Sequence, residues 1–456
     1  MSSTLPLSFQ QEWLWDAIQA NPSWQCAPAR AFRLQGPLNI TLLQQCLQEV
    51  TRNHDALRTH IVALDGAVKQ EIRDPPESLL ERVRVTGTST AQIVSNARRC
   101  VEDLGDRVLN PAVDPLWSAR LLELNESEHW LVVVMHRLIG DCVSIDQLYH
   151  ETRLLYSEWL QGLPSPLKPP AQYGDYTAWQ QQACVDWSRR HEPYWKKQLA
   201  EAAPVQWPAE TSLAPAPPGS LGKVSCSFGK TLSAGLQDLA RAARTLAAVP
   251  MFAIYAAVLW RWCRQSDFVL PLNTTGRPSA YKSAIGYFSY VLYLRLRITG
   301  EETFKELVSR VGNELFSSLA HPDFGRLARQ HPELLSGALF QWVTLQPDEA
   351  PDERVDVREF AEGQTIVPPG MTAIEVTAFD TTDGLRAFGS YRVDRFAAQT
   401  MEQFMEDLRW AAEIFVRNPD ARIAAVAEAG GDVHGAGPRA VRGSGAAYAG
   451  CGSGGL

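Results

Sequence analysis

A chain of 456 residues is too long for one compact core, so the sequence predicts two domains or two lobes of one architecture. The net charge of -8 argues against a general nucleic-acid binder, whose phosphate contacts need a basic surface. The N-terminus lacks the basic and apolar regions of a signal peptide, and the longest apolar stretch, between Arg244 and Arg261, is too short to span a bilayer. We therefore expect a cytoplasmic protein with no membrane partner and no nucleic-acid partner.

Helices and strands are mixed in the first part of the chain. Asn39 can cap a helix in which apolar residues recur at helical spacing. Further helices are expected at 8–18 and 91–104, and strands at 32–34, 83–86 and 117–124.

The stretch 131–144, LVVVMHRLIGDCVS, is the main candidate for a functional site. An unbroken apolar strand ends there in His136, Arg137, a short loop and Asp141, and ionisable groups at the end of a buried strand often line a site. Ser144 stands three residues before Gln147, which is the spacing of a capping box and predicts a helix that begins at Ser144 and runs to about residue 160.

Two Pro-rich stretches, 162–170 and 202–222, divide the rest of the chain. One continuous polar helix is expected between them, from 173 to about 199. Beyond them the pattern predicts helices at 236–247, 251–263, 304–319 and 396–416, and strands at 224–228, 268–272, 285–298, 339–345, 372–379 and 384–391. From residue 430 the Gly/Ala-rich tail is expected to be disordered. The prediction is an α+β fold with two lobes.

Several kinds of chemistry have no signal in the sequence. The eight cysteines show no CxxC or Cys/His spacing, so neither a metal site nor a disulfide framework is predicted. Without an export signal, reduced thiols are the simplest expectation. Phosphate-binding glycine loops and the G-x-S-x-G hydrolase pattern are also lacking, and no bound cofactor is expected.

At HRLIGDCVS the sequence resembles the condensation domains of nonribosomal peptide synthetases, which carry HHxxxDG there. Other segments resemble the family in the same order. They are SFQQEWLW, NHDALRT, YGDYTAWQ, EPYWKKQL, NTTGRP, IGYFSYVLYLR and the closing YRVDRF with its helix to NPDARIAAV, and together they span residues 6–426.

The resemblance implies two chloramphenicol-acetyltransferase-like lobes, in a V-shaped pseudo-dimer with a tunnel between them. It places the N-terminal lobe at 1–172, a connecting helix and Pro-rich linker at 173–222, the C-terminal lobe at 223–428 and the tail at 429–456. The family joins a carrier-bound acyl thioester to an amine or hydroxyl. The implied partners are therefore peptidyl or acyl carrier proteins whose phosphopantetheine arms bring the substrates. A free-standing, monomeric family member, or a piece of a larger synthetase, is expected.

Departures from the family pattern gather at the expected site. Arg137 replaces the tunnel-facing His, and arginine stays protonated, so it cannot accept a proton. His136 matches the first His. Because adjacent strand residues point to opposite faces, we expect it to point into the lobe as a hydrogen-bonded buried histidine rather than as a catalyst.

His136, Arg137 and Asp141 are the candidate catalytic residues, and the other site residues are expected to support them. The resemblance implies an ion pair between Asp141 and Arg277 of NTTGRP. Cys142 replaces a family Gly, and Tyr290 replaces a family Asn. The supporting set is completed by Ser144 and by Arg58 of NHDALRT.

Three interpretations remain open. The chain is a condensation enzyme that works by proximity without a base, with Arg137 donating to the developing oxyanion. It is instead an inactive scaffold similar to the X domains of glycopeptide assembly lines, which carry HRxxxDD and recruit a cytochrome oxygenase. Or it is a decayed fragment, to which the unusual tail would belong.

Overall fold

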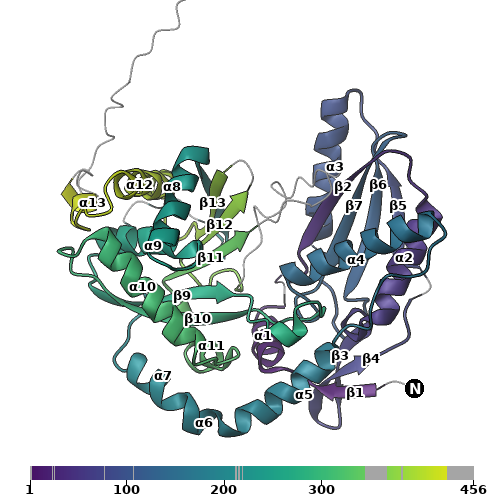
Figure 1. The fold of residues 1–456 in the computed structure, drawn as a ribbon, viewed down its shortest axis with the longest axis horizontal. Helices are drawn as coiled ribbons and strands as arrows, with labels where there is room; N and C mark the ends of the chain where they lie inside the picture. Colours follow the sequence, from purple (N-terminus) through teal and green to yellow (C-terminus); the bar gives the residue numbers. More distant parts are fainter. Residues whose placement is uncertain are drawn as a thin grey trace, which may run out of the picture.

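The computed structural model describes residues 3–428, except 23, 25, 77, 106, 211–212, 214–215, 218, 345–366 and 382–383. The predicted tail at 429–456 lies outside the described residues. Figure 1 shows two lobes that lean apart at the top of the view and meet below, where short helices of the connecting segment run beneath them. The α+β fold predicted from the sequence is confirmed, whereas the division into 1–172, 173–222 and 223–428 remains a prediction.

The N-terminal lobe is built on a four-stranded sheet of order β2-β7-β6-β5. Its strands are β2 (Ala29–Gln35), β5 (Leu80–Arg84), β6 (Trp117–Glu123) and β7 (Glu128–Met135), and its helices are α2 (Ile40–Asn53), α3 (Thr90–Gly105) and α4 (Cys142–Leu160). Along β7, Leu131 and Val133 pack in the cluster that holds the apolar residues of α2 and α4, whereas Val132 and Val134 pack against α3. Because helices cover both faces, β7 is an unbroken apolar run.

In Figure 1 a small second sheet lies at the lower end of the N-terminal lobe, and the first helix lies between the two lobes. The sheet has the order β1-β4-β3, and its strands are β1 (Ser3–Pro6), β3 (Thr59–Leu64) and β4 (Ala67–Ile72). The 3-10 turn η1 (Asp55–Arg58) directly precedes β3. Helix α1 (Phe9–Ala20) begins with a capping box between Ser8 and Gln11. The sequence did not predict β1 or β4, because both are short strands without strict alternation.

The connecting segment corrects one prediction. The single helix expected from 173 to 199 is divided into α5 (Tyr173–Ala183), η2 (Cys184–Asp186), α6 (Trp187–Arg190) and α7 (Glu192–Gln198). Pro193 lies in the first turn of α7, where its missing N–H costs nothing, but it cannot continue a preceding helix. The indoles of Trp187 and Trp195 donate to the carbonyls of Pro322 and His321, which holds the bent segment against the C-terminal lobe.

The C-terminal lobe is a six-stranded sheet of order β10-β9-β11-β12-β13-β8. Its strands are β8 (Leu221–Phe228), β9 (Asp267–Thr274), β10 (Tyr290–Arg297), β11 (Ala338–Thr344), β12 (Ile374–Thr381) and β13 (Gly384–Arg392). Its helices are α8 (Gly229–Ala242), α9 (Ala248–Cys263), α10 (Phe304–Leu319), α11 (Arg326–Gln330), α12 (Ala398–Arg417) and α13 (Ala425–Glu428), with the 3-10 turns η3 (Ser279–Tyr281) and η4 (Pro332–Leu335).

The two faces of this sheet have different neighbours. Leu270 and Leu292 pack in one apolar cluster with α9, α10 and α12, whereas Val269, Val291 and Tyr293 belong to the cluster that contains β7 and α4. Strand alternation therefore directs every second residue toward the N-terminal lobe. One apolar core continues across the lobe boundary, which fixes the lobes relative to each other.

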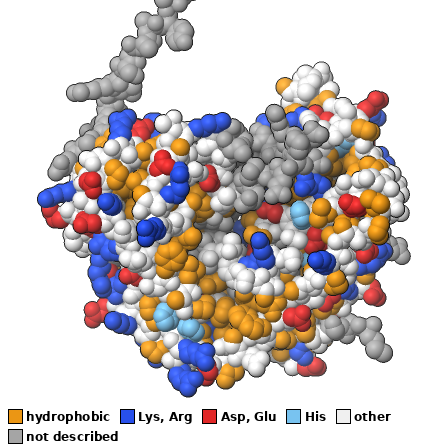
Figure 2. Space-filling model, in the orientation of Figure 1, with side chains coloured by type: hydrophobic (Ala, Val, Ile, Leu, Met, Phe, Trp, Pro, Cys, Tyr) orange, Lys and Arg blue, Asp and Glu red, His pale blue; other side chains and the backbone are white. Residues whose placement is uncertain are grey.

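No helix in the described part of the chain is both long and apolar enough to cross a bilayer. In the space-filling view, apolar side chains gather over the lower region where the lobes meet (Figure 2).

Candidate active site

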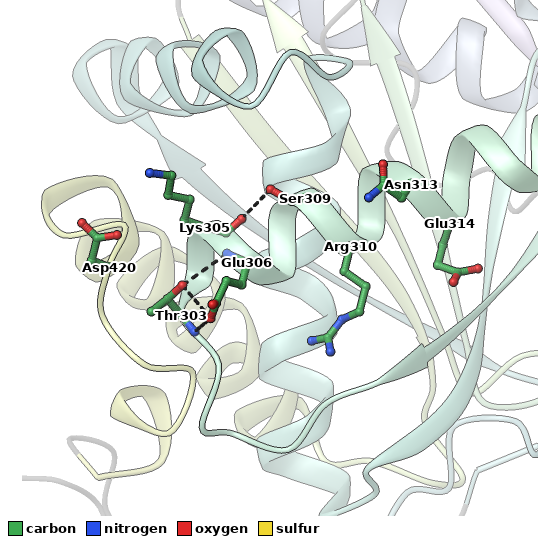
Figure 3. A pocket seen from close by; sticks show the side chains of 8 residues that line it. All are labelled: Thr303, Lys305, Glu306, Ser309, Arg310, Asn313, Glu314 and Asp420. Carbon is green, nitrogen blue, oxygen red and sulfur yellow. Dashed lines mark hydrogen bonds between the residues drawn. The ribbon is translucent and has the colours of Figure 1, made fainter.

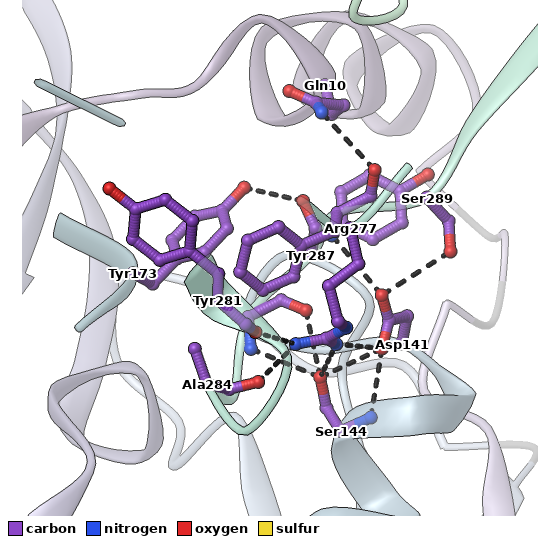
Figure 4. A network of polar contacts seen from close by, with 11 residues as sticks. Gln10, Asp141, Ser144, Tyr173, Arg277, Tyr281, Ala284, Tyr287 and Ser289 are labelled. Carbon is purple, nitrogen blue, oxygen red and sulfur yellow. Dashed lines mark hydrogen bonds and ion pairs between the residues drawn. The ribbon is translucent and has the colours of Figure 1, made fainter. Parts of the chain in front are cut away.

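The N-terminus of α4 differs from the prediction. The helix begins at Cys142 with Asp141 as its N-cap, and Asp141 Oδ1 accepts from the backbone N–H of Ser144 at 2.9 Å. The predicted capping box at Ser144 is therefore wrong, because the aspartate three residues earlier caps the helix. Ser144 instead points toward the C-terminal lobe (Figure 4).

Asp141 forms the expected ion pair with Arg277. Nη2 of Arg277 donates to Asp141 Oδ1 at 2.8 Å, and the two side chains, Arg277 and Asp141, are only 6% and 5% exposed. The guanidinium lies 4.1 Å from the ring centroid of Phe288, and Nη1 donates to the carbonyls of Tyr281 and Ala284. The pair joins the two lobes in a largely dehydrated position, where charge-assisted hydrogen bonds are strongest.

The loop 284–289, which the sequence assigned to a strand, is held by the same group of residues. Ser144 Oγ lies 2.8 Å from the carbonyl of Gly286 and accepts from its N–H at 3.1 Å. Asp141 Oδ2 accepts from the N–H of Phe288 at 3.3 Å and from Ser289 Oγ at 3.4 Å. Tyr173 donates to the carbonyl of Tyr287 at 2.5 Å. These contacts explain why 285–289 is not a strand, because its backbone groups bond to side chains of the N-terminal lobe and to Tyr173 of the connecting segment.

His136 is buried and neutral. Strand β7 ends at Met135, so the alternation argument does not apply to His136 and Arg137. Nδ1 of His136 accepts from the N–H of Leu138 at 3.1 Å, which places the proton of the neutral ring on Nε2. Burial, and then the charge of Arg137, lower the pKa of His136 to about 3. A group this weakly basic fits a structural role.

Arg137 lies two residues beyond the end of β7. Its backbone N–H donates to the carbonyl of Cys26 at 2.8 Å, and its side chain is half-buried. Burial alone would lower the pKa of Arg137, but the neighbouring Cys26, Tyr287, Cys142 and Glu375 raise it. Arginine stays protonated at any working pH, so the guanidinium is a permanent cation.

The other predicted residues are dispersed around this centre. Cys142 is the first residue of α4 and is not among the positive-φ residues, so loss of the family Gly strains nothing in the backbone. Arg58 lies in η1 and bonds to Asp55 and to the carbonyl of Arg73. These contacts belong to the N-terminal lobe, so the structure does not bring Arg58 to the Asp141–Arg277 pair.

Tyr290 lines a narrow cavity close to the pair. The cavity is also lined by Gln10, Trp13, Asn273, Tyr287, Ser289, Val291, Gly325 and Ala328, and its volume is about 10 Å³. That volume holds about one water molecule. Ser289 lines this cavity and also bonds to Asp141, so the cavity lies beside the candidate site. The ring of Tyr290 reduces the space there.

A larger, open groove lies elsewhere. It has a volume of about 700 Å³ and is lined by residues of α10 and its N-terminal loop together with Asp420 (Figure 3). None of these residues belongs to the Asp141–Arg277 network. Among the described residues no group of three or more His, Cys, Asp or Glu side chains could hold a metal ion.

Sequence reasoning missed one part of the site. The loop residues Ser289 and Gly286 lie inside a segment that resembles the family. The motif therefore marked this segment, but it did not show that these two residues contact Asp141 and Ser144.

Comparison with known proteins points to one family. The family model described as "Condensation domain" matches residues 1–428. A linear gramicidin synthase of Brevibacillus parabrevis is 27% identical over 436 residues, which is 92% of this chain but only 8% of that synthase. This chain therefore spans a small part of that relative.

Two solved structures share the fold. The SgcC5 protein from Streptomyces globisporus, in complex with a naphthyl ethanediol and sucrose, superposes with a TM-score of 0.78 at 24% identity and covers 91% of this chain and 100% of that one. The X-domain from teicoplanin biosynthesis in complex with OxyB gives a TM-score of 0.73 at 22% identity, covering 94% of this chain and 96% of that one.

Proposed function

The chain belongs to the condensation-domain family, and from this premise we propose that it forms an amide or ester between a carrier-bound acyl thioester and an amine or hydroxyl acceptor. Condensation domains are generally acyltransferases of nonribosomal peptide biosynthesis. The observation that carries the proposal is the Asp141–Arg277 ion pair, which holds the N-terminus of α4 and the adjacent Arg137 against the C-terminal lobe.

The proposed chemistry starts from proximity. When two reactants are held in contact, their reaction becomes effectively unimolecular, and this can supply much of the rate acceleration over the reaction in water. The lone pair of the acceptor attacks the thioester carbonyl, the new C–N or C–O bond forms, and the C–S bond breaks with its electrons on sulfur. The proton of the acceptor ends on the departing thiol.

Arg137 is proposed to stabilise the transition state of this reaction. As a permanent cation in a half-buried position, it can donate to the carbonyl oxygen as negative charge develops there. His136 is proposed to support the loop rather than to react, because its pKa of about 3 makes it a poor proton acceptor at neutral pH.

The substrates are proposed to arrive on phosphopantetheine arms of peptidyl or acyl carrier proteins, with no cofactor bound to the chain itself. We propose that the chain works as a monomer in the cytoplasm.

A second candidate is an inactive scaffold. The HR pair at 136–137 and the structural similarity to the X-domain that was solved with OxyB support a role in recruiting a cytochrome oxygenase to a carrier-bound substrate. The chain departs from that pattern at Cys142.

The deciding experiment offers carrier-bound acyl donors with an amine or an alcohol to the purified protein and measures product by mass spectrometry. The enzyme proposal expects product from wild type and little from Arg137→Ala. An inert wild type that gains activity from Arg137→His with Cys142→Gly would contradict it. Binding of an oxygenase by an inert wild type would favour the scaffold.

A further inference from the structure

We propose that Gln11 of α1 is a positioning residue for the condensation reaction, because its side-chain amide holds the loop 136–141, which carries Arg137. This inference rests on the proposed function and adds to it a residue that acts through Arg137 rather than on the substrate. It is carried by the hydrogen bond from Gln11 Nε2 to the carbonyl oxygen of Leu138, which is 2.7 Å long and joins residues 127 positions apart.

Leu138, the residue after Arg137, is held by side chains on both of its backbone groups. Its N–H donates to His136 Nδ1 at 3.1 Å, and its carbonyl accepts from Gln11. Leu138 and Gln11 are fully buried, so water does not reach this bond to replace it. If the donor were lost, the buried carbonyl would have to turn toward another donor, and Arg137 would move with it.

The amide of Gln11 is fixed in one orientation by three neighbours. Oε1 accepts from the backbone N–H of Ser8 at 2.9 Å, which is the capping-box bond at the start of α1. Nε2 donates to the carbonyl of Leu138 and, at 3.2 Å, to Gln70 Oε1. A rotated amide would place its oxygen against these two acceptors. Capping of the helix uses only Oε1, so it does not explain why an N–H group of the same amide bonds to the loop.

The capping residue Ser8 continues the contact to the C-terminal lobe. Ser8 Oγ lies 2.7 Å from the hydroxyl of Tyr173, and Tyr173 donates to the carbonyl of Tyr287 at 2.5 Å. A phenol has one O–H and a carbonyl can only accept, so Ser8 is the donor to Tyr173. Hydrogen bonds therefore run from loop 136–141 through the first turn of α1 to loop 284–289, in addition to the ion pair between the lobes. Within this chain of bonds, the side chain of Gln11 is the part that contacts loop 136–141.

The first variant, Gln11→Met, removes the donor and keeps an unbranched side chain of similar length. We expect kcat to fall about 10- to 100-fold, because a displacement of about 1 Å at the reacting groups can cost about 100-fold in rate. KM for both substrates should change by less than about twofold, since no substrate contact is removed. The matched control is Gln172→Met, which removes an amide hydrogen bond of 2.8 Å to the carbonyl of Asn53 and should leave kcat unchanged.

A double-mutant cycle with Arg137→Ala tests whether Gln11 acts through Arg137. In the Arg137→Ala background, Gln11→Met should lower the residual rate by less than about twofold, because no guanidinium is left to displace. Product is measured by mass spectrometry after long incubation, and thermal unfolding shows whether each variant is folded. If Gln11→Met does not fold, Gln11→Glu replaces it, because a glutamate keeps the acceptor for the N–H of Ser8. The kcat of Gln11→Glu relative to wild type should rise as pH falls, because only the protonated carboxyl can donate to Leu138.

The outcomes separate this inference from the proposed function. If wild type forms product and folded Gln11→Met retains its kcat, the inference is overturned and the condensation reaction stands. An equally large fall in rate in the Arg137→Ala background also overturns it, because the effect then does not pass through Arg137. A fall in kcat that Gln172→Met shares equally overturns it as well, because a general loss of packing is then responsible. A wild type that forms no product overturns the proposed function, and the inference with it.

Discussion

Asp141 Oδ1 lies 2.8 Å from Arg277 Nη2, and the two residues come from different lobes and are 136 positions apart in the chain. Asp141 also caps α4, so one carboxylate fixes the helix N-terminus and the lobe boundary together. A substitution of either residue should therefore destabilise both the N-terminus of α4 and the contact between the lobes.

Arg277→Ala should destabilise the fold strongly. It leaves the Asp141 carboxylate buried without its counter-charge, which costs about 3–5 kcal/mol for a buried pair. Chemical denaturation measures the free energy of unfolding. The control is Arg329→Ala, which removes half-exposed ion pairs with Glu12 and Asp16 and should cost about 1 kcal/mol or less. Equal losses in the two variants would contradict the role given to Arg277.

Ser144→Ala should cost about 1–3 kcal/mol of stability, because the N–H of Gly286 and one donor of Arg277 lose their acceptor in a buried position. Ser309→Ala removes an exposed hydroxyl that bonds within α10 and serves as the control. The comparison uses thermal unfolding of both variants. A Ser144→Ala variant as stable as wild type would show that the loop 284–289 does not depend on this hydroxyl.

The burial of His136 predicts a loss of stability in acid. Its pKa falls from 6.5 to about 3 on folding, so the unfolded chain binds more protons between these values and stability decreases as pH falls through 6.5. Between pH 7.5 and 5.5 wild type should lose about 1 kcal/mol from this group. His136→Asn keeps an acceptor for the N–H of Leu138 and should lack this loss. Identical pH slopes for the two proteins would contradict a neutral, buried His136.

The burial of Asp323 predicts the opposite pH dependence, a loss of stability as pH rises. Burial raises the pKa of Asp323 from 3.8 to about 7, and Oδ1 has no hydrogen-bond partner among the described residues. The folded state therefore retains the proton longer than the unfolded chain, and stability from this group is present below pH 4 and lost as pH rises to 7. Asp323→Asn should remove a decrease of about 2 kcal/mol between pH 5 and 7, measured by denaturation at both pH values. An unchanged slope would indicate that Asp323 is ionised in the fold.

Tyr290→Asn should change the choice of acceptor if condensation occurs. Removing the ring enlarges the cavity of about 10 Å³ beside Ser289, so kcat/KM for bulky acceptors should rise about tenfold relative to small ones. Tyr290→Phe keeps the ring and should leave the ratio unchanged. A competition assay with a small and a bulky amine measures the ratio, and a constant ratio in Tyr290→Asn would place the acceptor elsewhere.

Much of the fold followed from local patterns. Helices such as α2 and α10 have regular apolar spacing and capping residues, and the strand β7 has an apolar run long enough to be recognised. The prediction was wrong where a tertiary contact competed with a local signal. Asp141 displaced Ser144 as the cap, Pro193 and two indole hydrogen bonds divided the connecting helix, and loop 284–289 replaced the start of a predicted strand.

The sequence by itself determined the family, through the order of its motifs, and the chemical type of each site residue, including the permanent charge of Arg137. Only the tertiary structure decided that Gly286 and Ser289 belong with Ser144 and Asp141, and that Arg58 does not. The physical reason is that periodicity and capping are set within a few residues. Which side chains meet across the lobe boundary depends instead on strand register and on how two separately folded sheets pack around one shared core.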